Sequence, residues 1–215
     1  MSRLIVDTAF AGTTKTNAIE PQAGTSHITK SGYRPGEIIE QFSAVADGRT
    51  VAVQSGSYTM DNVTAVQSSS TSYADMNGSN ISYTPPSGTK YVVYEYQFKM
   101  DVTNNSGISH YKLLVDGTEV DPAYKNYSSN YASTNWHHAN LHTSVYWVFD
   151  LTAGSDDAAN GKFASWTSAK ALKCQFRGYT TSYTVNIHGN VWRDGAGASS
   201  PHIVTLPMLK IQAIA

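Results

Sequence analysis

ISYTPPSGTKYVVYEYQFKMDVTNNSGISHYKLLVDGTEV, residues 81–120, is the stretch that decides the fold of this chain. Within it, apolar and aromatic side chains alternate with polar ones. The apolar set is Val92, Tyr94, Tyr96, Phe98 and Met100, and the polar set is Glu95, Gln97 and Lys99. A repeat of two residues is typical of a strand with one buried face and one solvent-exposed face. The stretch therefore predicts consecutive antiparallel strands joined by turns.

Length and composition favour one large β domain, with or without an appendage. The chain has 215 residues, of which 14% are charged and 40% are hydrophobic. The charged share lies well below the usual quarter, and Ser, Thr, Asn, Gly and Tyr fill the difference. Surfaces that are polar but uncharged suit particles that pack side by side, because like-charge repulsion is weak. A formal net charge of −1 without a basic tail argues against nucleic acid as a partner.

Cys174 is the only cysteine of the chain, so an intrachain disulfide is impossible. It shares a strand face with Leu172 and Phe176, which predicts a small buried hydrophobe rather than a reactive thiol. No apolar run approaches the roughly 20 residues of a membrane span, and the N-terminal run is too short for a signal peptide. We therefore expect a soluble protein, made in the cytoplasm, with no membrane partner.

The pattern along the chain predicts an extended arm over residues 1–35 and a head over residues 36–215. The arm is rich in Gly, Thr, Ser and Pro and has no periodicity that would bury a face. Either a neighbouring subunit or attachment site orders it, or it is a floppy leader. In the head, short strand patterns are separated by turn signals, as in sandwiches and jelly rolls. The fold class is therefore predicted as all-β, an antiparallel β-sandwich of jelly-roll type, with strands that include residues 38–42, 51–53, 143–151, 171–177, 183–192 and 203–214.

Three local signals refine this prediction. Asp116-Gly117 predicts a hairpin, because a type I′ turn needs positive φ at both central residues. Residues 155–161 predict one capped helical turn in a chain otherwise almost without helix. Near the C-terminus, Leu209, Ile211 and Ala213 share one face, which places the last strand inside a sheet or at a subunit contact.

The region from residue 121 to 142 is predicted to be an irregular loop with aromatic side chains. The candidate ligand-binding residues are Tyr124, Tyr127, Tyr131 and Trp136, together with Trp192 further along the chain. Rigid aromatic faces beside Asn and Ser donors are typical of recognition loops and of sugar-binding surfaces. Two interpretations stay open: these rings bind an external ligand, or they cover the sandwich edge and pack against a partner subunit.

We predict no metal, no cofactor and no catalytic site. His138 and His142 are four residues apart, a spacing that suits two metal ligands on a helix, but no helical pattern surrounds them. Asp156 and Asp157 lack the alternating acidic pattern of a calcium loop. The chain has neither a nucleophile elbow nor a phosphate-binding glycine loop. A pair of catalytic carboxylates is the kind of site that a structure reveals, since such residues lie far apart in sequence.

Several segments resemble one group of viral proteins. They are LIVDT (residues 4–8) with the arm that follows, YRPGEIIEQF (33–42), SGSYTMDNVTA (55–65), SNISYTPPSGTKYVVYEYQF (79–98), ISHYKLLVDGTEV (108–120), DDAANGKFASWTSAKALKCQFRGY (156–179) and VTLPMLKIQAIA (204–215). Together they are similar to short tail-fibre and other virion structural proteins, fibre heads or decoration proteins, of marine tailed phages and related aquatic viruses.

This resemblance implies an attaching arm followed by a jelly-roll-like head, commonly trimeric, with no catalytic residues. It predicts a fibre, knob or decoration subunit of the virion, which docks on capsid, portal or tail proteins through residues 1–35 and displays its head outward. The expected partners are further copies of the chain, as a homotrimer, those virion proteins, and a host surface glycan. The alternative is a carbohydrate-binding, lectin-like module for host glycans. A third hypothesis, a depolymerase of host polysaccharide, would require a carboxylate pair in a groove.

Overall fold

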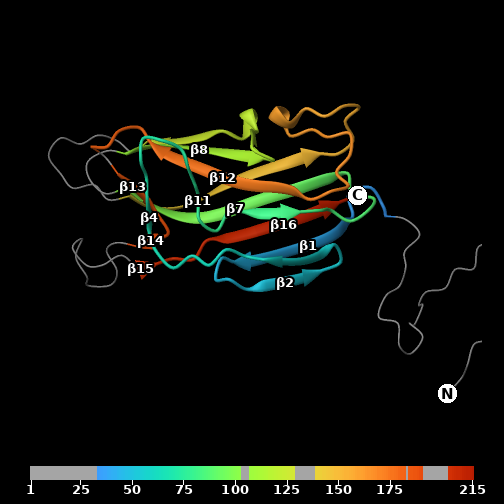
Figure 1. Ribbon diagram of the computed structural model, residues 1–215, viewed down its shortest axis with the longest axis horizontal. Coiled ribbons are helices and arrows are strands. Elements are labelled where there is room, and N and C mark those ends of the chain that lie inside the picture. The colour runs from blue at the N-terminus through green and yellow to red at the C-terminus, as the bar shows by residue number, and fades with distance from the viewer. Residues whose placement is uncertain (1–32, 103–106, 129–138, 183, 191–202) are drawn as a thin grey trace, which may run out of the picture. The chain divides into compact units, whose positions relative to one another are not determined.

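A computed structural model describes residues 33–102, 107–128, 139–182, 184–190 and 203–215 (Figure 1). The chain divides into two units between Gly32 and Tyr33, so almost all of the predicted arm lies outside the described residues. The body begins slightly before the predicted boundary at residue 36. There, Gly36 N donates a hydrogen bond to Ala215 O at 2.7 Å, and Ala215 N donates one to Glu37 O at 2.9 Å. These bonds join the start of the body to its C-terminus.

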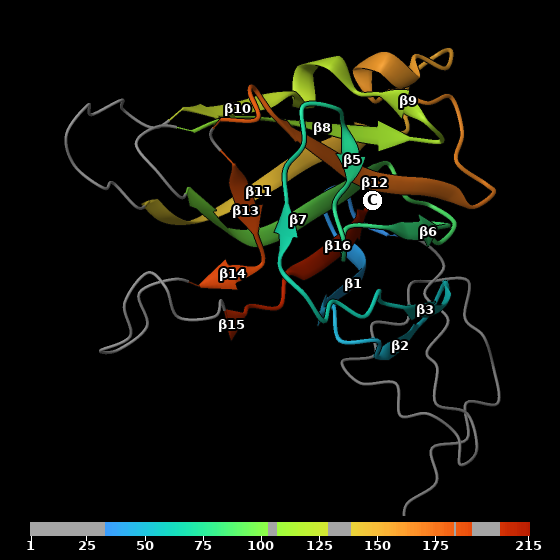
Figure 2. The same cartoon turned by 60° about the vertical axis from the view of Figure 1, so that its left-hand side comes forward.

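The body contains two main antiparallel sheets (Figures 1 and 2). The β7 sheet has the order β1 (Ile38–Val45), β16 (Met208–Ile214), β7 (Tyr91–Val102), β13 (Val185–Ile187) and β4 (Gln67–Ser68), with β11 (Ala139–Asp150) also paired to β7. The β8 sheet has the order β10 (Lys125–Ser128), β8 (Ile108–Val115), β12 (Lys170–Gly178) and β5 (Ala74–Asp75); β6 (Ile81–Tyr83) also pairs with β12, and β9 (Thr118–Glu119) with β8.

Smaller elements complete the described chain. They are the ribbon of β2 (Thr50–Val53) and β3 (Gly56–Thr59), the pair β14 (Gly189–Asn190) and β15 (Ile203–Val204), and the 3₁₀ turns η1 (Asp121–Ala123) and η2 (Ala158–Asn160). The all-β antiparallel class predicted from the sequence is confirmed. Within the described residues, no helix is long and apolar enough to cross a bilayer.

One apolar core lies between the inward faces of the two sheets. The predicted alternation in β7 is confirmed, with Tyr94, Tyr96 and Met100 fully buried. Contacts across the core join the sheets: the rings of Phe98 and Tyr111 lie 5.4 Å apart, and the Tyr111 hydroxyl donates to Met100 Sδ at 3.6 Å. Such burial of aromatic and aliphatic side chains is the main source of folding free energy.

Cys174 lies in this core, as predicted. Its side chain is fully buried on β12, and its Sγ lies 3.4 Å from the Tyr94 hydroxyl of β7. Burial raises the pKa of the thiol to about 12. A thiol that is both protonated and shielded from water is inert towards electrophiles.

The local predictions for the hairpin and the last strand are confirmed. Asp116 and Gly117 have φ values of 48° and 83° and connect β8 to β9. β16 lies between β1 and β7, and Leu209, Ile211 and Ala213 point into the core. The predicted helical turn is the 3₁₀ turn η2, which ends at Gly161 with φ 66°.

Three sequence predictions need correction. Residues 121–142 are not wholly irregular, because residues 125–128 form β10 and residues 139–142 begin β11. The strand predicted at 183–192 is broken between β13 and β14 by His188, whose φ of 65° takes the backbone out of the extended region. The strand predicted at 203–214 is interrupted at 205–207, where Pro207 lacks the N–H that a ladder requires.

Candidate functional site

The structure separates the predicted aromatic residues. Tyr124 follows η1 and is 41% exposed. Tyr127 is half-buried on β10 and packs against the core, so its ring covers the sandwich interior. Tyr131, Trp136, Trp192 and His138 lie outside the described residues. A ligand-binding role for these side chains remains a prediction.

Tyr124 belongs to a group of side chains on the outer face of the β8 sheet, here called the tyrosine–cation cluster. Its members are Tyr73, His110, Lys112, Tyr124 and Arg177. The β8–β12 register places His110 directly opposite Arg177, and Lys112 opposite Gln175. Tyr73 precedes β5, and its ring centroid lies 4.2 Å from Lys112 Nζ and 5.3 Å from Arg177 Cζ. Both contacts are within the range of cation–π attraction.

A chain of hydrogen bonds joins the two tyrosines of the cluster to its histidine. The Tyr73 hydroxyl donates to the Tyr124 hydroxyl at 3.5 Å, and the Tyr124 oxygen lies 2.6 Å from His110 Nδ1. Burial, followed by the charge of Arg177, lowers the pKa of His110 below its usual value. The imidazole is therefore neutral at pH 7, and its Nδ1 is available to accept the Tyr124 proton.

The charges around the cluster do not balance. Lys112 Nζ lies 3.2 Å from Glu119 Oε2, and Lys173 Nζ lies 2.7 Å from Asp75 Oδ2. Among the described residues, Arg177 has no carboxylate partner, and its guanidinium lies against the Tyr73 ring. The outer face of the β8 sheet thus carries one guanidinium whose charge is not offset nearby.

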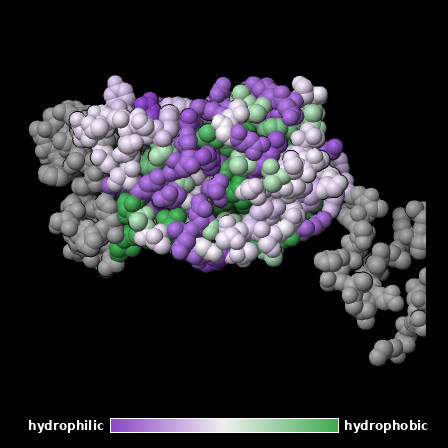
Figure 3. Space-filling model, viewed as in Figure 1, coloured by the Kyte–Doolittle hydropathy of each residue, from purple (hydrophilic) through white to green (hydrophobic). Residues whose placement is uncertain are grey.

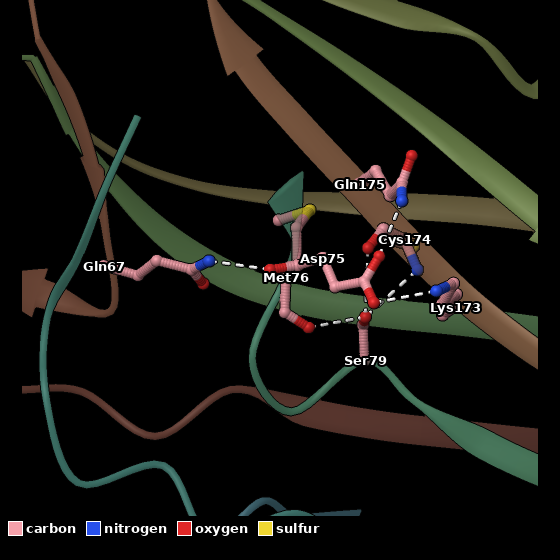
Figure 4. Close-up of polar contacts among 7 residues, drawn as sticks. All are labelled: Gln67, Asp75, Met76, Ser79, Lys173, Cys174 and Gln175. Carbon is pink, nitrogen blue, oxygen red and sulfur yellow. Dashed lines mark hydrogen bonds and ion pairs between the residues drawn. The ribbon is translucent and has the colours of Figure 1, made fainter. Parts of the chain in front are cut away.

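Hydrogen bonds to β12 fix the segment that carries Tyr73 (Figure 4). Asp75 accepts from Lys173 Nζ and from Gln175 Nε2, at 2.7 and 2.6 Å. Ser79 Oγ donates to Met76 O at 2.6 Å and accepts from Cys174 N at 3.0 Å. Tyr73 lies two residues before Asp75, so these bonds hold its ring over the cations from the neighbouring strands.

A hollow of about 310 Å³ opens on the outer face of the other sheet, the β7 sheet. It is lined by Gln97, Phe98, Lys99, His142, Thr143, Ser144, Leu206 and Met208. His142 is exposed and pairs with Lys99 across the ladder, so the nearest charged neighbour in register is a cation. In the part of the chain that the structure describes, no three His, Cys, Asp or Glu side chains come together as metal ligands.

The acidic residues that resembled a calcium loop stabilise the local chain. Asp156 Oδ1 accepts a hydrogen bond from Ala164 N at 2.8 Å, and Asp157 Oδ2 accepts one from Asn160 Nδ2 at 2.8 Å. Asp116 acts in the same way, since its Oδ1 accepts from Ala171 N at 2.8 Å. These contacts agree with the turn chemistry expected of short acidic side chains.

Sequence reasoning missed the buried polar side chains, of which Glu40 and His188 are two examples. Glu40 on β1 is 7% exposed and accepts hydrogen bonds from Ser55 N, Ser55 Oγ and the Tyr83 hydroxyl, at 2.7, 2.7 and 2.9 Å. His188 is fully buried, with Nε2 3.4 Å from the Tyr96 hydroxyl. Burial lowers the pKa of His188 to about 4. Neither position carries a sequence motif, and both depend on which elements pack together.

The β7 sheet ends on one side with a long strand, β11. Its 12 residues pair with β7 throughout, and within the described chain its other edge has only an isolated bridge, from Asp150 to Lys162. Tyr146 and Val148 project from its outer face and are 45% and 38% exposed. Lys125 Nζ donates to the Ser144 carbonyl at 3.1 Å, which satisfies one acceptor of this edge.

Comparison with models of known protein families finds no match, and comparison with curated proteins also finds none.

Proposed function

We propose that this chain is a structural protein of a phage virion: a fibre, knob or decoration subunit that assembles as a homotrimer. In this proposal residues 1–35 dock on capsid, portal or tail proteins, and a head of jelly-roll type points outward. The observation that carries the proposal is the outer face of β11, where Tyr146 and Val148 are exposed beside an edge that is largely open in the described chain. Long open edges with apolar residues are uncommon on isolated proteins.

A second copy of the chain is the partner that best fits this surface. On the outer face of the β7 sheet, Glu95 and Lys210 offset each other at 3.7 Å, so two such faces meet without strong repulsion. On the side of the body drawn in Figure 3, which is the side seen in Figure 1, hydrophilic and near-neutral residues surround separate areas of apolar ones. Symmetric self-association is the usual way in which a single chain closes such a surface.

The oligomeric state tests the assembly surface. We expect the full chain to have about three times its 23.3 kDa mass in solution, measured by light scattering after size exclusion. The double substitution Tyr146→Lys, Val148→Lys is expected to shift the protein to the monomer mass, because it places two cations in each contact. As a control, Tyr179→Lys alters a residue that is 63% exposed and directly follows β12, and it is expected to leave the mass unchanged. A wild-type protein that stays monomeric at high concentration would refute this surface.

Deletion of residues 1–32 tests the attachment role separately. The body begins at Tyr33, so we expect the shortened chain to fold and to keep the oligomeric mass of the full chain. We also expect it to be lost from purified particles, as measured by immunoblotting of particles that carry either version. A shortened chain that joins particles as well as the full chain does would show that residues 1–32 are not the anchor.

Recognition of a host surface glycan is the second candidate function. The observation that favours it is the tyrosine–cation cluster, where the exposed ring of Tyr124 lies beside His110. Aromatic rings next to fixed polar groups are a common arrangement for binding sugars. A fibre head that binds glycan would combine both functions.

A further inference from the structure

We propose that the tyrosine–cation cluster binds a sugar that bears a carboxylate, as part of a host surface polysaccharide, and that Arg177 holds this carboxylate. The inference deepens the second candidate function, glycan recognition, and rests on it. It does not depend on self-assembly, because the cluster lies on the outer face of the β8 sheet and the assembly surface lies on the β7 sheet.

Charge is the first argument. The two lysines of this face have carboxylate partners, Glu119 for Lys112 and Asp75 for Lys173. Arg177 has none among the described residues, which leaves one positive charge for a ligand. A single carboxylate supplies one negative charge, and its two oxygens match the fork of a guanidinium. A phosphate monoester would bring nearly twice that charge.

Fixed geometry is the second argument. Arg177 is held on one side by the ring of Tyr73, and it lies opposite His110 in the ladder. Arg177 Nε and His110 Nε2 are both shielded from the surface and have no hydrogen-bond partner in the described structure. Polar atoms in this state are usually paired with an ordered water, so the protein itself leaves part of the hydrogen-bonding capacity of both side chains unused. A guanidinium that is already oriented loses less conformational entropy when it binds.

The surroundings suit a sugar ring rather than a free small acid. The Tyr124 ring is exposed, while its oxygen is held by His110, so the ring has a defined orientation. On β10, Asn126 and Ser128 are exposed and lie opposite His110 and Ile108 in the ladder. They add neutral hydrogen-bonding groups beside the aromatic face. In an acidic sugar, the C–H surface would pack on the aromatic face and the hydroxyls would bond to the neutral polar groups. The carboxylate would pair with the one cation.

A matched pair of ligands tests the proposal with the full chain. The probes are trigalacturonic acid and its methyl ester, in which each carboxylate is replaced by an uncharged ester, and binding is measured by calorimetry or by chemical shift changes. We expect the acid to bind at least tenfold more tightly than the ester. We expect Arg177→Gln to weaken binding of the acid about tenfold or more, as for the loss of a charge-assisted hydrogen bond. Arg177→Lys keeps the charge but not the fork, and is expected to give an intermediate loss.

Arg49→Gln is the control variant. Arg49 is an exposed arginine that pairs with Asp47 near β2, away from the β8 sheet, and its substitution is expected to change the affinity less than twofold. If Arg177→Gln does not fold, Arg177→Lys and Tyr124→Ala carry the test. The proposal is overturned if no binding of the acid is detected at millimolar concentrations. It is also overturned if the ester binds equally well, or if the Arg177 variants bind the acid as tightly as the wild type does. Competition by inorganic phosphate at lower concentrations than the acid would assign the cluster to phosphate and would also overturn it.

Discussion

Gly78→Ala is expected to lower the free energy of unfolding by about 3 kcal/mol, from the sum of a left-handed backbone penalty and overpacking. Gly78 has φ 86°, a conformation that an L-residue with a side chain adopts at a cost. A Cβ at this position would lie 2.8 Å from Pro207 Cγ, 2.9 Å from Ala46 Cβ and 3.0 Å from Val63 Cγ2. These neighbours have short or ring-closed side chains, so they have little freedom to move away.

Gly117→Ala is the matched control for this prediction. Gly117 has φ 83°, nearly the same as Gly78, but no atom lies within 4 Å of the point that a Cβ would occupy there. We therefore expect Gly117→Ala to lower the free energy of unfolding only by the backbone contribution, about 1 kcal/mol. Urea denaturation of both variants measures the two changes under one set of conditions. Equal losses would show that the packing around Gly78 contributes nothing, contrary to the geometry described above.

Acid is expected to destabilise the protein through His188. The folded pKa of this histidine is about 4, below its ordinary value of 6.5, because burial disfavours the charged imidazole. The unfolded chain therefore binds a proton that the folded chain does not bind between these two values. The stability contributed by the neutral His188 is fully present above pH 6.5 and is lost as the pH falls towards 4. The expected loss from pH 7 to pH 4 is about 3 kcal/mol, from the difference in pKa.

His188→Asn tests the assignment of this loss. Asparagine tolerates the positive φ of 65° at this position and does not titrate. We expect the variant to be less stable at pH 7 but to show a much shallower fall between pH 6.5 and 4.5, measured by urea denaturation at each pH. The pKa of His110 is also lowered, so this residue makes the free energy of unfolding fall with pH in the same direction. His110→Gln is therefore the companion control. A His188→Asn variant with the wild-type slope would refute the role of His188.

Much of the fold follows from local sequence. The alternation from Val92 to Met100 fixes the two faces of β7, and the same rule places Cys174 and Ile211 in the core. Asp116-Gly117 fixes a hairpin because both residues adopt positive φ. In each case the information lies within a few neighbouring residues, since side chains alternate across a strand whatever lies beside it.

The sequence alone therefore determined the strand faces, the buried cysteine and the all-β class of this protein. Only the tertiary structure decided that Tyr73, His110 and Arg177, which are distant in sequence, meet on one outer face. It also decided that Tyr124 faces outward while Tyr127 packs against the core, and that His188 is buried. The physical reason is that local alternation sets the side to which each residue projects, whereas the choice and register of neighbouring strands depend on long-range pairing and on packing in the shared core.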